Sequence, residues 1–152
     1  TVHTNDAASG FTRLLNWRVE PYLIASTVKG ILAQRLVRRI CKECREPYEP
    51  KPEELKMTGI DPDKPIKVFK GKGCLSCRNT GYKGRIGIYE LLLVDGEISE
   101  LVLQQAPGYR IREQAKKNGM TTLLEDGVIK LQRGDTTVSE LYETLGTTKI
   151  VL

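Results

Sequence analysis

The sequence of 152 residues lacks several common patterns, and each absence narrows the possible functions. No apolar run approaches the ~20 residues that a membrane-spanning helix needs, which excludes such a helix. No segment has the pattern of a secretory signal peptide, so nothing supports an oxidising compartment in which disulfides persist. Neither an internal repeat nor a low-complexity segment is present. The phosphate-binding pattern G-x-x-x-x-G-K-[ST] is also missing from these residues.

Cysteine is scarce as well, and all four cysteines fall in two pairs, Cys41-x-x-Cys44 and Cys74-x-x-Cys77. A Cys-x-x-Cys pair places two thiolates on one turn. Two such turns can complete a tetrahedral four-cysteine site for Zn²⁺. We therefore predict a bound Zn²⁺ with Cys41, Cys44, Cys74 and Cys77 as its ligands.

The residues around the cysteine pairs suit that geometry. Gly73 precedes the second pair, and Gly81 and Gly84 follow it. Glycine lets the backbone bend so that its N–H groups approach the thiolate sulfurs. Basic side chains that flank the pairs are expected to stabilise the thiolates, and these are Lys42, Arg45, Lys72 and Arg78.

Two other uses of the cysteines fit the sequence less well. Two disulfides would need the oxidising compartment for which there is no support. A thioredoxin-like redox site would need one Cys-x-x-Cys pair after a strand of a βαβ unit, whereas this chain has two matched pairs. A closed all-cysteine site leaves no position for a substrate, so we expect the Zn²⁺ to be structural.

The composition is that of a globular chain, with 39% hydrophobic and 28% charged residues, but the charge is unevenly placed. Residues 1–89 hold 17 Lys and Arg against nine Asp and Glu, a balance of +8. Residues 90–152 hold seven against ten, a balance of −3. This asymmetry suggests two regions with different partners. The basic set Arg35, Arg38, Arg39 and Arg85 is most simply interpreted as a solvated face or a group of local ion pairs.

Hydrophobic periodicity and capping residues predict a mixed α/β chain. We expect a helix of about ten residues after a cap at Asn5 or Asp6, and a second helix that opens at Pro21 and carries apolar residues as far as Leu32. Strands are expected at 34–40, 66–70 and 85–93, with a proline-punctuated excursion between Pro47 and Pro65 that contains at most two helical turns. Four short helices are expected in the tail, beginning at Asp95, near Tyr109, at Thr122 and at Thr137.

Several stretches together resemble one family, the secretion ATPases of type II secretion and type IV pilus assembly (GspE/PilB-like). The stretch Val2–Ala7 is similar to the histidine box of that family. Further similar stretches are Glu20–Ser26, Ala33–Cys41, Gly73–Cys77, Thr80–Leu92, Gly119–Leu123 and Glu125–Gly127. One small departure is Trp17-Arg18, where the family more often has Met-Gly.

The resemblance implies a fold and a domain organisation. The chain looks like the C-terminal portion of such an ATPase, since both Walker motifs of the family lie upstream of the histidine box. We expect residues 1–40 to be the last part of a RecA-like core. Residues 41–84 would form an inserted tetracysteine zinc subdomain, 85–94 a strand returning to the core, and 95–152 a small helical C-terminal domain. Leu91–Asp95 fits the pattern of a Walker B strand, which is apolar and ends in an acidic residue. Residues 1–152 include no P-loop, however, so no nucleotide would be bound beside that strand.

The resemblance also implies site residues and partners. His3 would face the γ-phosphate of ATP in the complete protein, which binds ATP with Mg²⁺, and Thr4 and Asn5 would shape that turn. The family forms hexamers with nucleotide sites at subunit boundaries, where one of the basic residues could act. Its zinc subdomain is positioned towards an inner-membrane platform protein, which implies a cytoplasmic protein peripheral to the bacterial inner membrane. Without the P-loop, we expect no ATP hydrolysis by this chain alone.

Two other functions compete with this interpretation. A zinc-ribbon nucleic-acid-binding module would explain the basic front section, but no aromatic residue interleaves with the basic run Arg35–Arg45 to stack bases. We therefore expect no nucleic-acid partner. A chaperone-type cysteine module would repeat a glycine-rich motif at each cysteine pair, and here Cys44 is followed by Arg45-Glu46-Pro47.

Overall fold

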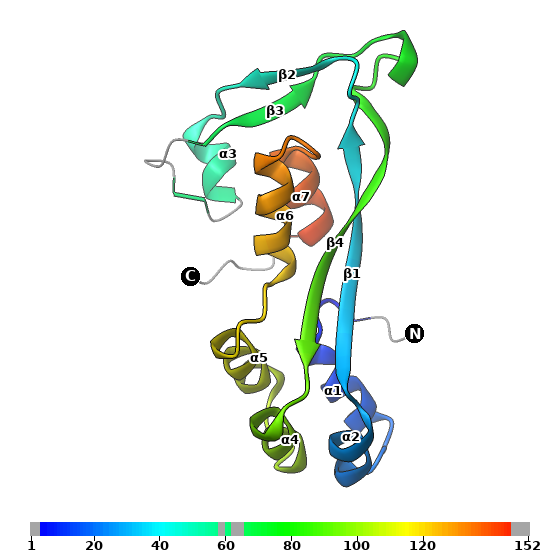
Figure 1. Ribbon diagram of the computed structural model, residues 1–152, viewed down its shortest axis with the longest axis vertical. Helices are drawn as coiled ribbons and strands as arrows, with labels where there is room; N and C mark the ends of the chain where they lie inside the picture. The colour runs from blue at the N-terminus through cyan, green and yellow to red at the C-terminus, as the bar shows by residue number, and fades with distance from the viewer. Residues whose placement is uncertain (1–3, 58–59, 62–65, 147–152) are drawn as a thin grey trace. The chain divides into compact units, whose positions relative to one another are not determined.

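The computed structural model describes residues 4–57, 60–61 and 66–146 of the chain (Figure 1). Val2 and His3 of the stretch similar to a histidine box lie outside the described residues. The chain divides into two compact units, Thr1–Gln34 with Tyr89–Leu123, and Arg35–Ile88 with Leu124–Leu152. Two long strands, β1 (Gly30–Ile40) and β4 (Tyr82–Leu93), pair with each other and contribute to both units.

Four helices build the first unit: α1 (Ala8–Asn16), α2 (Pro21–Thr27), α4 (Gly96–Leu103) and α5 (Gly108–Lys117). Helix α2 packs on α4, and α1 and α4 each pack on α5. Their apolar faces meet in a core of Phe11, Ile24, Leu92, Ile98, Val102 and Ile111, all fully buried. This burial stabilises helices that are too short to persist alone in water.

The predicted caps of the first unit are present. The Oδ1 atom of Asp6 accepts a hydrogen bond from the N–H of Ser9 at 2.7 Å, in the first turn of α1. Asp95 accepts one from the N–H of Ile98 at 2.9 Å at the start of α4. Helix α5 ends just before Gly119, whose φ of +92° suits glycine, as expected for a helix stop.

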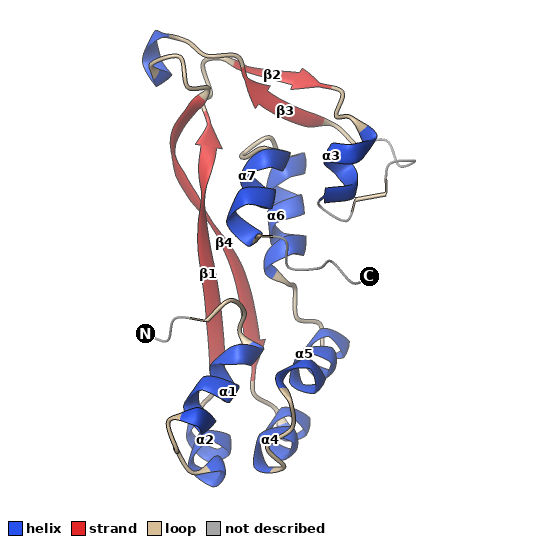
Figure 2. Ribbon diagram, turned by 180° about the vertical axis from the view of Figure 1, so that it is seen from behind, coloured by secondary structure: helices blue, strands red, loops and turns tan. Residues whose placement is uncertain are grey.

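The second unit contains two further strands, β2 (Arg45–Tyr48) and β3 (Val68–Gly71), and the helices α3 (Pro52–Met57), α6 (Leu123–Gln132) and α7 (Val138–Leu145). The first residue of α6, Leu123, still belongs to the first unit. Strands β2 and β3 form an antiparallel ribbon in which Pro47 pairs with Phe69 (Figure 2). The fully buried apolar residues of this unit are Val37, Ile40, Val68, Ile88, Leu131 and Leu141. Thr137 caps α7 by accepting from the N–H of Glu140 at 3.3 Å.

Two expectations about local structure were wrong. The second helix ends at Thr27, and Ile31 and Leu32 belong to β1, which begins at Gly30. The residues after Thr27 alternate between the two faces of a strand, with Leu32 exposed and Ala33 buried. The excursion after Cys44 opens with strand β2, which was not predicted because it contains Pro47. A two-stranded ribbon leaves one edge of each strand without a backbone partner, so a proline is tolerated there.

The observed fold class is mixed α and β, with two small sheets of two strands each among the described residues. In the part of the chain that the structure describes, no helix is long and apolar enough to cross a membrane. The RecA-like origin of the first residues remains a prediction.

Candidate functional site

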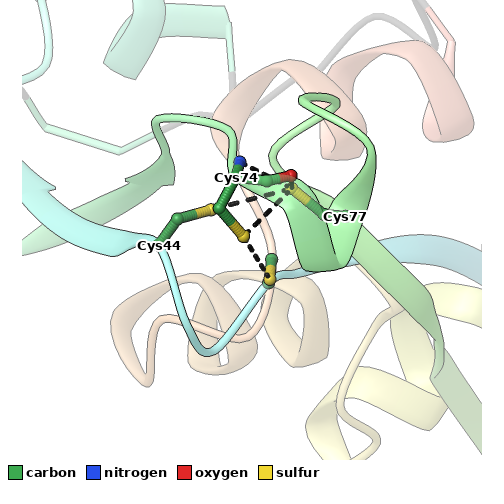
Figure 3. A group of neighbouring side chains, drawn as sticks. Cys44, Cys74 and Cys77 are labelled. Atoms are coloured by element: carbon green, nitrogen blue, oxygen red, sulfur yellow. Dashed lines mark hydrogen bonds between the residues drawn. The ribbon is translucent and has the colours of Figure 1, made fainter.

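The two cysteine pairs lie on two loops of the second unit. Cys41 follows the last residue of β1, and Cys44 precedes the first residue of β2. Cys74 and Cys77 lie in and next to a short 3₁₀ turn (Leu75–Cys77) that comes shortly after β3. The ribbon of β2 and β3 therefore joins the two loops, and the cysteines Cys44, Cys74 and Cys77 labelled in Figure 3 point toward one another.

The four sulfur atoms form a compact cluster. All four lie within 4.8 Å of one another, with sulfur–sulfur distances of 3.7 Å for Cys74–Cys77, 3.8 Å for Cys41–Cys74 and 3.9 Å for Cys44–Cys77. A tetrahedral site with Zn–S bonds of about 2.3 Å has sulfur atoms about 3.8 Å apart. The cluster thus has the size of a four-thiolate metal site. All four cysteines are free thiols, so the disulfide alternative finds no support.

Close backbone packing holds the two loops together behind the cluster. The N–H of Cys41 donates to the carbonyl of Gly81 at 2.9 Å, and the N–H of Lys72 donates to the carbonyl of Cys44 at 3.1 Å. Gly71 and Gly81 are in direct contact, because a Cβ atom on Gly71 would lie 2.1 Å from the carbonyl oxygen of Gly81. No side chain fits between these two segments. Gly81 also has a φ of +77°, which favours glycine on its own account.

The electrostatics of the thiols differ within the cluster. Burial raises the pKa of Cys44 to about 12. Burial also acts to raise the pKa of Cys77, but the N–H groups of Cys74 and Gly81 donate to its sulfur at 3.2 and 3.3 Å, and the net result is a pKa lowered to about 6. Cys77 is therefore prepared as a thiolate by backbone dipoles, which is the role expected of the neighbouring glycine-containing loop.

One of the flanking basic side chains, Arg45, makes its contacts away from the sulfur atoms. The guanidinium of Arg45 lies over the ring of Phe69 at 5.0 Å and donates to the carbonyls of Arg133 and Gly134 at 3.4 Å. Arg45 thus tethers β2 to the end of α6, and stabilisation of the thiolates by Lys42, Lys72 and Arg78 stays a prediction.

The outer surface of the cluster carries a polar network between the loops. Ser76 donates to Glu43 at 2.7 Å, and Lys83 donates to Ser76 at 2.6 Å and lies 3.8 Å from Glu43. Beside it, Leu75 is 93% exposed at the tip of the 3₁₀ turn.

Two members of the basic set form local ion pairs. Arg38 lies over the ring of Tyr82 at 4.3 Å and pairs with the buried carboxylate of Glu140, and Arg39 lies 3.4 Å from Asp135. The hydrogen bond to Glu140 raises the pKa of Arg38. This agrees with the simpler interpretation of the set, and it leaves Arg38 fewer hydrogen-bonding groups for a phosphate backbone.

In the first unit, Thr4 and Asn5 line an open polar hollow of about 460 Å³. Its other residues come from the turn before α1, from α1 and from the start of α5: Asp6, Ala8, Ser9, Thr12, Arg13, Asn16, Gly108, Tyr109 and Arg112. The hydroxyl of Thr4 donates to the carbonyl of Asp6 at 2.9 Å, which tightens the turn. Arg112 lies 3.7 Å from the carboxylate of Asp6.

Sequence reasoning missed one polar residue of the first unit, Glu90. Its side chain is fully buried and contacts the turn, α5 and the first residue of α6. The signal was present in the strand pattern, because Ile88, Glu90 and Leu92 alternate onto the same buried face of β4. A charged residue on a buried register of a strand points to a specific partner.

The fold and the sulfur cluster define a mixed α and β chain with four clustered cysteines that could hold a metal ion. The model of the family described as "Type II/IV secretion system protein" matches residues 1–143, and the chain belongs to this family. It is 44% identical over 143 residues to "Type IV pilus assembly ATPase PilB" of Thermus thermophilus, and 40% identical over 141 residues to "Type II secretion system ATPase E" of Vibrio cholerae. Each match covers 93% of this chain.

These relatives are much longer proteins. The chain spans 16% of the length of the Thermus relative and 28% of the length of the Vibrio relative. The match of the family model confirms, at the level of the family, the resemblance drawn from the cysteine pairs and the neighbouring motifs.

Proposed function

We propose that this chain is the C-terminal part of a motor ATPase that powers type II secretion or type IV pilus assembly. The match of the family model to residues 1–143 carries this proposal, since that span includes both cysteine pairs. In the complete protein, residues 1–40 and 85–94 belong to a RecA-like core, 41–84 to the zinc subdomain and 95–152 to a helical C-terminal domain.

The metal of the proposed subdomain is Zn²⁺, held by Cys41, Cys44, Cys74 and Cys77. The sulfur spacing near 3.8 Å and the all-thiolate donor set support this choice, because soft thiolates in a tetrahedral arrangement favour zinc. Four protein ligands leave no open coordination position, so the ion would supply folding free energy and rigidity.

The proposed role of the first unit is to complete an ATP site. His3 would sense the γ-phosphate, and Thr4 and Asn5 would shape the turn beside it. The position of Thr4 and Asn5 at the wall of a polar hollow next to the N-terminus of α1 supports this role. The bound ATP and Mg²⁺ would be held by the P-loop of the complete protein. Residues 1–152 contain no P-loop, so we expect no hydrolysis by the chain alone.

The proposed partners follow from membership of the family. The complete protein would assemble as a homohexamer and would act on an inner-membrane platform protein from the cytoplasmic side. Because the metal ion and the short ribbon would cross-link the zinc subdomain, the subdomain would be rigid and suited to transmit motion to a partner.

A native mass spectrum of the purified chain, with and without ATP, tests the first part of the proposal. We expect one Zn²⁺ per chain and no ATP adduct. A mass two or four hydrogens below that of the reduced chain, without metal, would indicate disulfides and would contradict the proposed zinc subdomain.

The second part is tested in the complete ATPase with His3→Ala. We expect a lower turnover number with nearly unchanged nucleotide binding, because the side chain is proposed to contact only the terminal phosphate. A turnover number equal to that of the wild type would remove His3 from the mechanism.

A further inference from the structure

Glu90 of β4 is a fully buried carboxylate in the first unit, with a side-chain exposure of 0%. Its Oε1 atom accepts a hydrogen bond from the N–H of Ala7 at 2.8 Å. Its Oε2 atom accepts one from the N–H of Leu123 at 3.3 Å and lies 3.8 Å from an Nη atom of Arg112. All three contacting groups are donors, so the site is built for a group that only accepts.

These contacts join segments that are remote in the sequence. Ala7 lies 83 residues before Glu90 and immediately precedes α1. Leu123 lies 33 residues after it and is the first residue of α6. Arg112 belongs to α5. One carboxylate therefore connects the residue before α1 to α5 and to the start of α6, both of which follow β4 in the sequence.

Arg112 adds a second connection to the same turn. Its other Nη atom lies 3.7 Å from Asp6 Oδ2, while Asp6 Oδ1 accepts from the N–H of Ser9 at 2.7 Å. The turn from Thr4 to Ala7 is thus held at its end by Glu90 directly and at Asp6 through Arg112. Thr4 and Asn5, which line the polar hollow, lie in the same turn.

Apolar burial alone does not call for a carboxylate here. The neighbouring positions on the buried face of β4 are Ile88 and Leu92, and an apolar residue at position 90 would avoid the cost of removing a charge from water. What a carboxylate supplies and an apolar side chain does not is a fixed geometry between the Ala7 N–H, the Leu123 N–H and Arg112.

We propose that Glu90 is a positioning residue that sets the conformation of the Thr4–Ala7 turn, with Arg112 as its ionic partner. This proposal rests on the proposed function for its consequence: the turn directly follows His3, so Glu90 governs how the turn faces the terminal phosphate. Loss of the carboxylate then lowers the turnover number of the complete ATPase and leaves the KM for ATP nearly unchanged.

The first experiment uses the 152-residue chain and needs no ATPase activity. Glu90→Gln keeps the size of the side chain but turns one acceptor into an NH₂ donor that faces another donor. We expect amide hydrogen exchange to rise about tenfold at Ala7 or at Leu123, whichever N–H the new NH₂ group faces, the equivalent of one lost hydrogen bond. Glu113→Gln, an exposed neighbour of Arg112 on α5, is the matched control and should leave both rates unchanged.

Should Glu90→Gln fail to fold, Arg112→Gln provides the second variant. It leaves both backbone hydrogen bonds of Glu90 in place and removes the link to Asp6, so exchange at Ser9 should rise several-fold more than in the Glu113→Gln control. Unchanged exchange at both Ala7 and Leu123 in a folded Glu90→Gln chain, or at Ser9 in Arg112→Gln, would overturn the proposal.

The second experiment measures steady-state kinetics of the complete ATPase carrying the same substitutions. Glu90→Gln should lower kcat about tenfold or more with KM for ATP within about twofold, and Glu113→Gln should change neither. A raised KM with unchanged kcat, or wild-type values of both, would refute the positioning role. An inactive wild-type protein would instead refute the proposed function, and the exchange rates would still decide whether Glu90 orders the turn.

Discussion

Replacing Gly71 by alanine is expected to weaken metal binding roughly 10- to 100-fold without removing any ligand. This range is typical for residues that do not bind the metal themselves but orient its ligands. The new Cβ atom would lie 2.1 Å from the carbonyl oxygen of Gly81, and this oxygen accepts the hydrogen bond from the N–H of Cys41. Contacts closer than about 3 Å are strongly repulsive, so the two loops must separate by about 1 Å. Such a shift is large compared with the ~0.2 Å tolerance of metal–ligand distances.

The assay is a competition titration of Zn²⁺ between the chain and a chromophoric chelator, with the thermal midpoint measured in parallel. Gly84→Ala is the matched control. Gly84 follows the second cysteine pair and has a φ of +79°, and a Cβ there would meet no atom within 4 Å. The control therefore carries a backbone strain of about 1–2 kcal/mol from its positive φ, which Gly71→Ala does not, and it has no steric clash. If both variants bound Zn²⁺ with the same affinity, close packing of the two loops would not be what shapes the site.

Three further predictions concern the second unit. Cys41→Ser should abolish stoichiometric Zn²⁺ binding and lower the thermal midpoint, because structural zinc supplies folding free energy; an unchanged metal content and midpoint would exclude that role. Metal binding at neutral pH should release the proton of Cys44, because burial raises the pKa of this thiol to about 12, and the metal affinity should therefore rise with pH. Calorimetry in buffers of different ionisation enthalpy counts the protons released. A pH-independent affinity would contradict this prediction. Glu140→Ala should destabilise the chain by about 1–3 kcal/mol in urea unfolding, because Arg38 loses acceptors for its backbone N–H and its Nε. Glu143→Ala, which removes only an exposed carboxylate 3.9 Å from Arg38, should cost less than about 0.5 kcal/mol, and equal losses would refute the argument.

The cysteine cluster was predictable because its chemistry is encoded locally. Each Cys-x-x-Cys pair fixes two sulfur atoms on one turn, and the sequence needs only one further condition, that the two turns meet. The left-handed backbone of Gly73 and Gly81 was predictable for the same reason. The identity of the bound ion stays a prediction.

The boundary between α2 and β1 was not predictable from periodicity. The residues Leu23, Ile24, Val28, Ile31 and Leu32 satisfy the helical spacing, and the short apolar run from Ile31 to Ala33 fits a helix or a strand. The decision depends on β4, which offers backbone partners to residues from Gly30 onward. Strand β2 was missed on similar grounds, since its partner β3 begins 20 residues after it ends.

Glu90 and Glu140 illustrate why the polar contacts of the two units could not be derived from hydrophobic patterning. A pattern treats glutamate as exposed, yet each of these carboxylates is buried and accepts a backbone N–H from a segment 83 or 102 residues away. The chain leaves each unit and returns to it, so each unit must be closed by contacts between remote segments. Apolar side chains can close such a gap in several registers, whereas a carboxylate that must satisfy fixed N–H donors permits very few. We therefore expect the buried acceptors to set where the returning segments dock, and the apolar core to set how strongly they are held.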